Sequence, residues 1–162
     1  MRLGRLAAVV LAAAVSVGAA AGAPTGGNAE KVTISVTSIL VSVKTKDVKP
    51  AGVSRGDRRI YRNTLRNAVA QFGKPKGAKV GSDSGTLTFT GAHTARYLGT
   101  ARLPGGTLVV RGAVKPVNQT ELRIAVVGGT GRYSSARGTL TVGQGDRRAL
   151  NVYRLVLHVT VA

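Results

Sequence analysis

Four glycines, two arginines and a tyrosine are concentrated in one short stretch, VVGGTGRYSSARGTLTV, residues 126–142. A glycine-rich loop binds phosphate through its backbone amides when it joins a strand to the N-terminus of a helix. The residues after Gly131 alternate like a strand instead, and no lysine followed by serine or threonine is present in the loop. The stretch therefore predicts a turn between two strands and excludes a phosphate or dinucleotide loop.

Acidic side chains are scarce, with six in the whole chain. Four aspartates fall in predicted turns, and one glutamate falls at the start of a predicted strand: Asp47, Asp57, Asp83, Asp146 and Glu121. Turn aspartates usually accept hydrogen bonds from local backbone amides, so no carboxylate pair of the glycosidase type is predicted. The two histidines have no neighbouring carboxylates, His158 is expected to face outward, and no metal site or cofactor is expected.

Four residues are candidates for contacting a bound molecule. His93 shares the alternation of the apolar residues before it and is expected on the inner face near a strand end, with a hydrogen-bonded position at the rim as the alternative. Tyr97 and Tyr133 could line or gate an interior, or pack with the hydroxyl at a wet edge. Arg137 could reach an anionic ligand, or tie its hairpin to backbone carbonyls.

Alternation with a period of two runs through almost the whole chain after residue 31, which indicates strands. We count eight strands joined by short turns or loops. Eight sequential antiparallel strands can close into a barrel, which removes the exposed edges of an open sheet; a two-sheet sandwich is the alternative. The interior of such a barrel is either filled with side chains or holds one small ligand.

Three segments carry details of this all-β prediction. The first strand, residues 31–44, changes parity near Thr37 and Ser38, which predicts a β-bulge there. The segment RRIYRNTLRNAVAQ has some helical spacing but contains asparagine and threonine, poor helix formers, and is predicted to be a strand beginning at Arg59. Residues 73–85, GKPKGAKVGSDSG, are predicted to be a turn-rich connection.

The N-terminal segment has the features of a secretory signal peptide. Arg2 and Arg5 precede a run without charges, residues 6–23, that ends in small residues; a signal anchor is the alternative. We expect residues 1–23 to be removed, residues 24–30 to be a flexible lead-in, and residues 31–162 to form one domain. The chain has no cysteine, so no disulfide framework is expected.

The chain carries a formal net charge of +18. Such an excess favours attraction to polyanions, here acidic polymers of the cell envelope, or only provides a solvated basic surface. Nucleic acid is not expected as a partner, because the arginines are scattered and there are only four tyrosines and two phenylalanines for bases to stack on. We expect a secreted protein, loosely associated with the envelope.

The stretch 126–142 resembles the signature hairpin of the dirigent and allene oxide cyclase superfamily, in which a Gly-Gly-Thr-Gly turn precedes an aromatic residue and an Ala-Arg-Gly. Other segments resemble successive hairpins of small exported bacterial members: GDRRIYRNTLRN, KVGSDSGTLTFTG, GTARLPGGTLVVRGAV and LNVYRLVLHV. The resemblance covers most of residues 31–161. The positions that match the family hairpin are Gly128, Gly129, Thr130, Gly131, Tyr133, Ala136, Arg137 and Gly138.

This resemblance implies an eight-stranded antiparallel barrel with an apolar lumen open at one end. In plant dirigent proteins such a lumen steers the coupling of phenoxy-type radicals, and in the cyclases it folds an unstable fatty-acid epoxide. Plant dirigent proteins commonly carry an acidic residue shortly after the glycine turn, where this chain has Arg132, and another in a His-Asp-Ile block that the first strand here lacks. The matching positions therefore argue for the fold more than for chemistry.

Three functions remain open. The first is a barrel that binds or orients a small apolar or aromatic molecule without catalysis, alone or as a homo-oligomer. The second is an enzyme of the cyclase or dirigent type, which two polar groups within hydrogen-bond reach of each other in the lumen would favour. The third is a basic structural or adhesive envelope protein, which a lumen filled with large side chains would favour.

Overall fold

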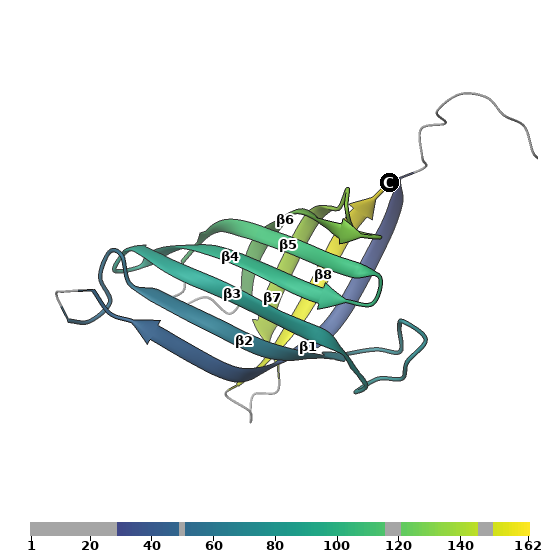
Figure 1. Ribbon diagram of the computed structural model, residues 1–162, viewed down its shortest axis with the longest axis horizontal. Helices are drawn as coiled ribbons and strands as arrows, with labels where there is room; N and C mark the ends of the chain where they lie inside the picture. The colour runs from purple at the N-terminus through teal and green to yellow at the C-terminus, as the bar shows by residue number, and fades with distance from the viewer. Residues whose placement is uncertain (1–28, 49–50, 116–120, 146–150) are drawn as a thin grey trace, which may run out of the picture.

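Eight antiparallel strands form a closed barrel in which each strand pairs with the next along the chain and the last pairs with the first (Figure 1). The computed structural model describes residues 29–48, 51–115, 121–145 and 151–162, so the predicted signal peptide lies outside the described residues. The strands are β1 Glu30–Lys46, β2 Arg58–Asn67, β3 Lys79–Gly91, β4 Thr94–Leu103, β5 Gly106–Val114, β6 Glu121–Gly131, β7 Arg137–Gln144 and β8 Val152–Val161. The predicted barrel is confirmed.

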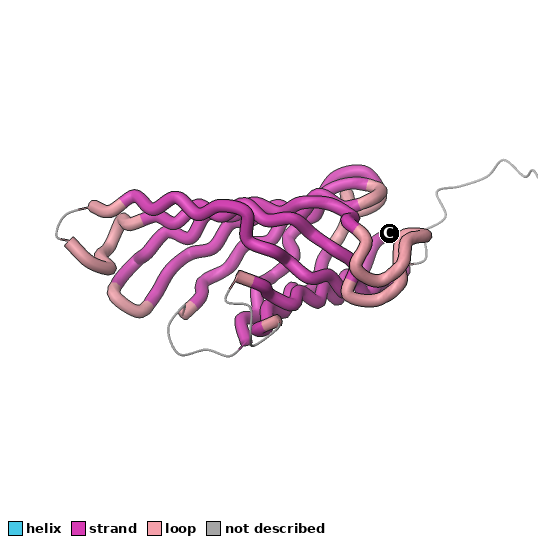
Figure 2. The backbone as a smooth tube through the Cα atoms, turned by 90° about the horizontal axis from the view of Figure 1, so that it is seen from below, coloured by secondary structure: helices cyan, strands magenta, loops and turns pink. Residues whose placement is uncertain are grey.

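The strands form one tilted, twisted layer that curves back on itself (Figure 2). Inward-facing residues alternate with outward-facing ones along each strand, so the apolar set of each strand lies on the inside of the barrel. No helix in the described part of the chain is long and apolar enough to cross a membrane.

In strand β1 the same set of alternate residues continues to face inward beyond the point where the sequence pattern predicts a change of face. Val36, Ser38 and Leu40 all face inward, and the register with β2 shifts between Leu40 and Ser42. The β-bulge is therefore at Val41, and its predicted position near Thr37 and Ser38 is wrong. The reason is that Ser38 is a polar residue of the inner face, where its hydroxyl has a buried partner.

Strands β2 and β3 extend the wall that carries most of the polar inner residues. The prediction of a strand over RRIYRNTLRNAVAQ is confirmed as far as Asn67. The predicted connection over residues 73–85 is wrong in its second half, because β3 begins at Lys79. The Gly, Ser and Asp residues of this segment have low strand propensity, yet β3 pairs along this length with both β2 and β4, and this pairing overrides propensity.

One end of the barrel is closed by the turn between β6 and β7, which lies across it. Tyr133 is only 1 % exposed, and its hydroxyl donates a hydrogen bond to the carbonyl of Pro104 at 3.1 Å. Gly129 is required beside it, since a Cβ there would lie 2.0 Å from the Thr107 carbonyl oxygen. The glycine stretch of residues 126–142 thus places an aromatic plug in the end of the barrel.

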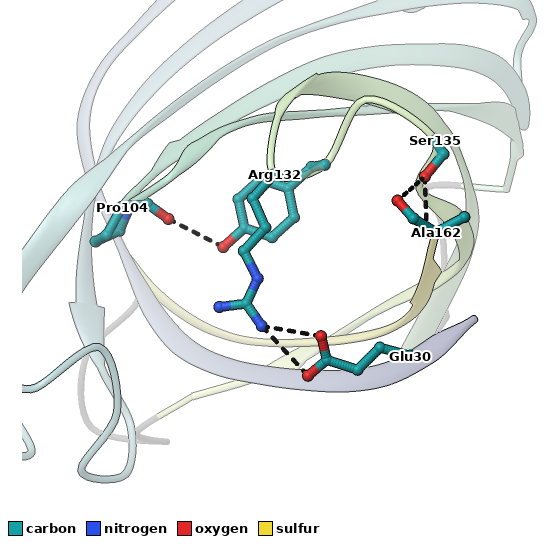
Figure 3. Close-up of polar contacts among 6 residues, drawn as sticks. Glu30, Pro104, Arg132, Ser135 and Ala162 are labelled. Carbon is teal, nitrogen blue, oxygen red and sulfur yellow. Dashed lines mark hydrogen bonds and ion pairs between the residues drawn. The ribbon is translucent and has the colours of Figure 1, made fainter. Parts of the chain in front are cut away.

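Polar contacts fasten this turn to both chain ends of the barrel (Figure 3). Arg132 forms an ion pair with Glu30 at 3.2 Å, and Ser135 exchanges hydrogen bonds with the backbone of Ala162. Glu30 is the first residue of β1, so the ordered strand begins inside the predicted lead-in of residues 24–30.

We predict that Tyr133→Ala lowers the free energy of unfolding by about 3–5 kcal/mol, because it leaves a cavity at a fully buried aromatic site. Tyr133→Phe removes only the hydrogen bond to Pro104 and should lower it by about 0.5–1.5 kcal/mol. Urea unfolding of both variants measures the two values, and equal losses would show that the ring does not act as a plug.

Candidate functional site

A cavity of about 380 Å³ occupies the barrel between the Tyr133 plug and the opposite end. Most of its wall is aliphatic, contributed by β1, β2, β3, β5, β6, β7 and β8: Val36, Leu40, Leu65, Leu87, Val110, Val114, Leu122, Ile124, Leu140, Val142, Leu155 and Leu157. Ligand sites in proteins span about 300–1,000 Å³, so the volume fits one small molecule.

A polar trio, Ser38, Asn63 and Asp83, interrupts the apolar wall on three adjacent strands. The Ser38 hydroxyl donates to Asp83 Oδ2 at 2.9 Å, and the Asn63 amide donates to Asp83 Oδ1. Asn63 is paired with Asp83 across β2 and β3 and with Leu40 across β1 and β2. Ser38 lies two residues before Leu40 on the same inner face of β1, so the strand register brings the three polar side chains close together.

The environment of Asp83 favours its neutral form. Removal from water raises the pKa of this carboxyl, and the hydrogen bonds from Asn63 and Ser38 only partly oppose the rise. The Asn63 Oδ1 atom is buried and has no partner in the described structure. Rotation of the amide would let it accept from a protonated Asp83, so the trio can hold the proton that the raised pKa retains.

Tyr97 lies against the barrel wall beside the trio. Gly85 and Gly99 are paired across β3 and β4, and the Tyr97 ring covers both of them. A Cβ at Gly99 would lie 2.7 Å from the ring, so these glycines create the recess that the ring occupies. Burial, with a smaller contribution from the nearby Asp83, raises the pKa of the Tyr97 hydroxyl, which therefore stays protonated at neutral pH.

The end of the cavity away from Tyr133, here called the mouth, carries Arg59, Tyr61 and Tyr153. The guanidinium of Arg59 lies over the ring of Phe89, 5.3 Å from its centroid. Burial raises the pKa of Tyr61, and the charge of Arg59 opposes that rise. The cavity therefore has a cationic, hydroxyl-bearing mouth and a weakly acidic group deeper inside.

The four residues predicted to contact a ligand lie in different parts of the barrel. Tyr97 lines the cavity, one of the two positions considered for it, and its contact with a bound molecule stays a prediction. Tyr133 is the plug and Arg137 donates to the Ala136 carbonyl at 2.8 Å, so both serve the closed end and neither lines the cavity. His93 lies in the exposed turn between β3 and β4, and its predicted inner position is wrong because Thr90 is an extra residue that breaks the alternation.

The aspartates differ in a way that sequence reasoning missed. Asp57 behaves as predicted for a turn aspartate: it accepts from the backbone amides of Val48 and Ser54, each at 2.7 Å, and these bonds lower its pKa. The same prediction of a turn is wrong for Asp83, which lies within β3. The signal in the sequence is the alternation Asp83, Gly85, Leu87, Phe89, which continues the inner face of β3 back to the carboxyl.

No group of three or more His, Asp or Glu side chains among the described residues could hold a metal ion. His158 faces outward as expected, within 3.1 Å of the Thr33 hydroxyl. The polar residues that line the cavity are the trio, Thr100, three tyrosines and Arg59.

Comparison with known proteins gives consistent results. A family model described as the allene oxide cyclase barrel like domain matches residues 37–157. No curated protein is similar enough in sequence to count as a relative. Among solved structures, "Pyocyanin demethylase" is 25 % identical with a TM-score of 0.64, covering 79 % of this chain and 99 % of its own.

Two further solved structures share the fold at lower identity. A Diels-Alderase from Streptomyces koyangensis is 21 % identical with a TM-score of 0.66, covering 85 % of this chain and 71 % of its own. A pterocarpan synthase dirigent protein is 16 % identical with a TM-score of 0.64, covering 87 % of this chain and 96 % of its own.

We predict that Asp83→Asn gains stability relative to the wild type as the pH rises. The raised pKa means that the folded state holds a proton on Asp83 that the unfolded state has already released, so folding becomes less favourable above the ordinary pKa of 3.8. The difference in unfolding free energy should grow as the pH rises above that value, by at most about 1.4 kcal/mol for each pH unit, which is the limit for one proton. It should level off once Asp83 is ionised in the folded state as well.

Urea unfolding at several pH values from about 3 to 7 measures this difference, because that range begins below the ordinary pKa of an aspartate. Asp47→Asn is the control, because Asp47 is exposed and does not line the cavity, and its difference from the wild type should be smaller than that of Asp83→Asn. Parallel curves for wild type and Asp83→Asn would contradict the prediction.

We also predict that Gly99→Ala destabilises the barrel by about 1–3 kcal/mol, because the added methyl overpacks the recess beneath Tyr97. Gly143→Ala is the matched control, since a Cβ at that strand position meets nothing within 4 Å. In a Tyr97→Leu background the penalty at Gly99 should shrink. An unchanged penalty in that double variant would place its origin elsewhere.

Proposed function

We propose, from the premise that this chain belongs to the allene oxide cyclase barrel-like family, that its lumen binds a small aromatic molecule and that Asp83 donates a proton or hydrogen bond to a heteroatom of it. The observation that carries the proposal is the trio: a lumen carboxyl with a raised pKa, held in place by Ser38 and Asn63. A carboxyl with a raised pKa keeps its proton to a higher pH than a free carboxyl, which is the direction that general-acid chemistry requires.

The shape of the site supports an aromatic ligand. The cavity is apolar over most of its wall, and its polar groups lie on one side, on β1 to β4 and on β8, which pairs with β1. A flat molecule can pack against the aliphatic wall and still reach Asp83 and the Tyr97 hydroxyl, which has no hydrogen-bond partner in the described part of the chain. The similarity to a pyocyanin demethylase is consistent with a small-molecule ligand.

Of the three functions left open by the sequence, the trio favours the second. Two polar groups within hydrogen-bond reach of each other inside the lumen distinguish a reactive site from a passive carrier, and Ser38 and Asp83 meet that condition. The cavity argues against a purely structural envelope role, because large side chains do not fill it.

We propose further that the protein acts after export, because residues 1–23 combine N-terminal arginines with an uncharged run that ends in small residues. Expression of the full chain in an exporting host, with mass measurement of the mature N-terminus, tests this part separately. Retention of the intact N-terminus in the cytoplasm would contradict it.

The function is tested with 4-phenylpyridine, which carries one basic ring nitrogen on two linked aromatic rings. The nitrogen-15 shift of the labelled probe reports protonation or hydrogen bonding of that nitrogen. We predict that wild-type protein moves this shift towards the protonated form. Asp83→Asn, whose amide can donate a hydrogen bond but no proton, should reduce the change and weaken binding roughly tenfold, because a hydrogen bond to a charged partner contributes about 1.5–3 kcal/mol.

Asp47→Asn is the control for this measurement, because it removes an exposed carboxylate of the same type. It should leave both the shift and the affinity at their wild-type values. An identical probe shift in wild type and in Asp83→Asn would show that Asp83 does not act on the ligand.

A further inference from the structure

We infer that Arg59 is an anion-binding residue of the mouth, and that the ligands of this barrel are elongated aromatic carboxylic acids with a heteroatom at the end opposite the carboxylate. This inference rests on the proposed function, since it names the class of molecule that the same lumen accepts. It adds a second polar contact to the one that Asp83 makes.

The spacing of the two polar ends follows from β2. Arg59, Tyr61 and Asn63 lie on the same face of this strand and all line the cavity. Asn63 lies four positions after Arg59, a distance of about 13 Å along the strand at roughly 3.3 Å per residue. A ligand that reaches both ends is therefore longer than one aromatic ring, and Tyr61 lies alongside its middle.

The guanidinium of Arg59 is oriented but not neutralised. It lies over Phe89, a buried residue with 4 % exposure, and close to the Tyr61 hydroxyl, where burial raises the pKa and the charge of Arg59 lowers it. The ion pairs found among the described residues are Arg123 with Glu121 and Arg132 with Glu30, and neither involves Arg59. Arg59 therefore presents its charge without a carboxylate partner in the part of the chain that the structure describes.

The acidic residue nearest in sequence is already engaged. Asp57 is 5 % exposed and accepts hydrogen bonds from the amides of Val48 and Ser54 and from the Ser54 hydroxyl. Its oxygens hold the loop that precedes β2, so it does not supply the missing partner of Arg59. Among the residues that the structure describes, no carboxylate pairs with Arg59, and an anionic group on the ligand would complement it.

A carboxylate is the anion that fits this arrangement. Its plane matches the fork of N–H donors on a guanidinium and allows two parallel hydrogen bonds. The hydroxyls of Tyr61 and Tyr153 line the same mouth and can donate to a carboxylate oxygen. The strongly positive net charge of the chain attracts anionic ligands towards the protein from solution.

Three soluble probes separate the two ends of the site. 4-(Pyridin-4-yl)benzoate carries a ring nitrogen at one end and a carboxylate at the other, 4-phenylpyridine lacks the carboxylate, and biphenyl-4-carboxylate lacks the nitrogen. Isothermal titration at fixed ionic strength gives the Kd of each probe for the full mature chain and its variants.

We predict that Arg59→Gln weakens binding of both carboxylate probes at least tenfold and changes the Kd of 4-phenylpyridine less than twofold. Arg59→Lys should give an intermediate loss, because it keeps the charge without the planar fork. Arg58→Gln is the matched control: it removes the same charge from the next residue, which is exposed and does not line the cavity. It should change every Kd less than twofold.

Each pattern of binding decides between the two proposals. Equal losses in Arg58→Gln and Arg59→Gln would overturn the inference, since they would show a general charge effect. Binding of 4-phenylpyridine with no gain from the carboxylate would overturn it and leave the role of Asp83 intact. Binding of the carboxylates through Arg59, with Asp83→Asn inert towards all probes, would support the inference and refute the proposed function; failure of all three probes to bind would contradict both.

Discussion

The pairing of β1 with β8 is the constraint on which the rest of the molecule depends. It runs from Glu30 opposite Val161 to Ile39 opposite Val152, and it joins the two ends of an otherwise open sheet. Closure satisfies the backbone groups of both outer strands and turns one face of every strand towards a common interior. The interior can then be packed, hollow or both, and side-chain size along each strand decides which.

In this barrel one end is packed with side chains and the other end is hollow. Near the β6–β7 turn, Tyr133 and aliphatic residues fill the space, and contacts from Arg132 and Ser135 fix the turn to the first strand and the last residue. Towards the other end the side chains leave a cavity, and polar groups enter the wall on β1, β2, β3, β4 and β8. The packed end provides stability, which allows the hollow end to carry a carboxyl partly removed from water.

Much of the fold could be predicted from alternation alone, because each strand of a closed barrel has one apolar face and therefore an apolar residue at every second position. The errors arise where a polar side chain belongs to the inner face. Ser38 and Asp83 interrupt the apolar pattern, so the pattern predicts a bulge at one and a turn at the other. Their contact joins different strands, and nothing in the local sequence around either residue reveals the other.

The failure at His93 has a different physical origin. One extra residue at Thr90 reverses the inner and outer faces, and single-residue bulges leave little trace in composition. The hairpin motif, in contrast, is recognisable because its glycines are required by close backbone approach at the plug. Its specificity concerns the closed end, which is why the motif identifies the family and does not locate the cavity residues.

The plug at Tyr133 also determines which end of the barrel a ligand can use to enter and leave the lumen. Since a molecule cannot pass the closed end, it must arrive and depart at the Arg59 end, and the part that goes in first is the part that reaches Asp83. A bound molecule blocks its successor until it has left. Under the proposed function, release of the bound molecule through the mouth would limit how fast the site becomes free again, and tighter binding at the mouth would slow that release.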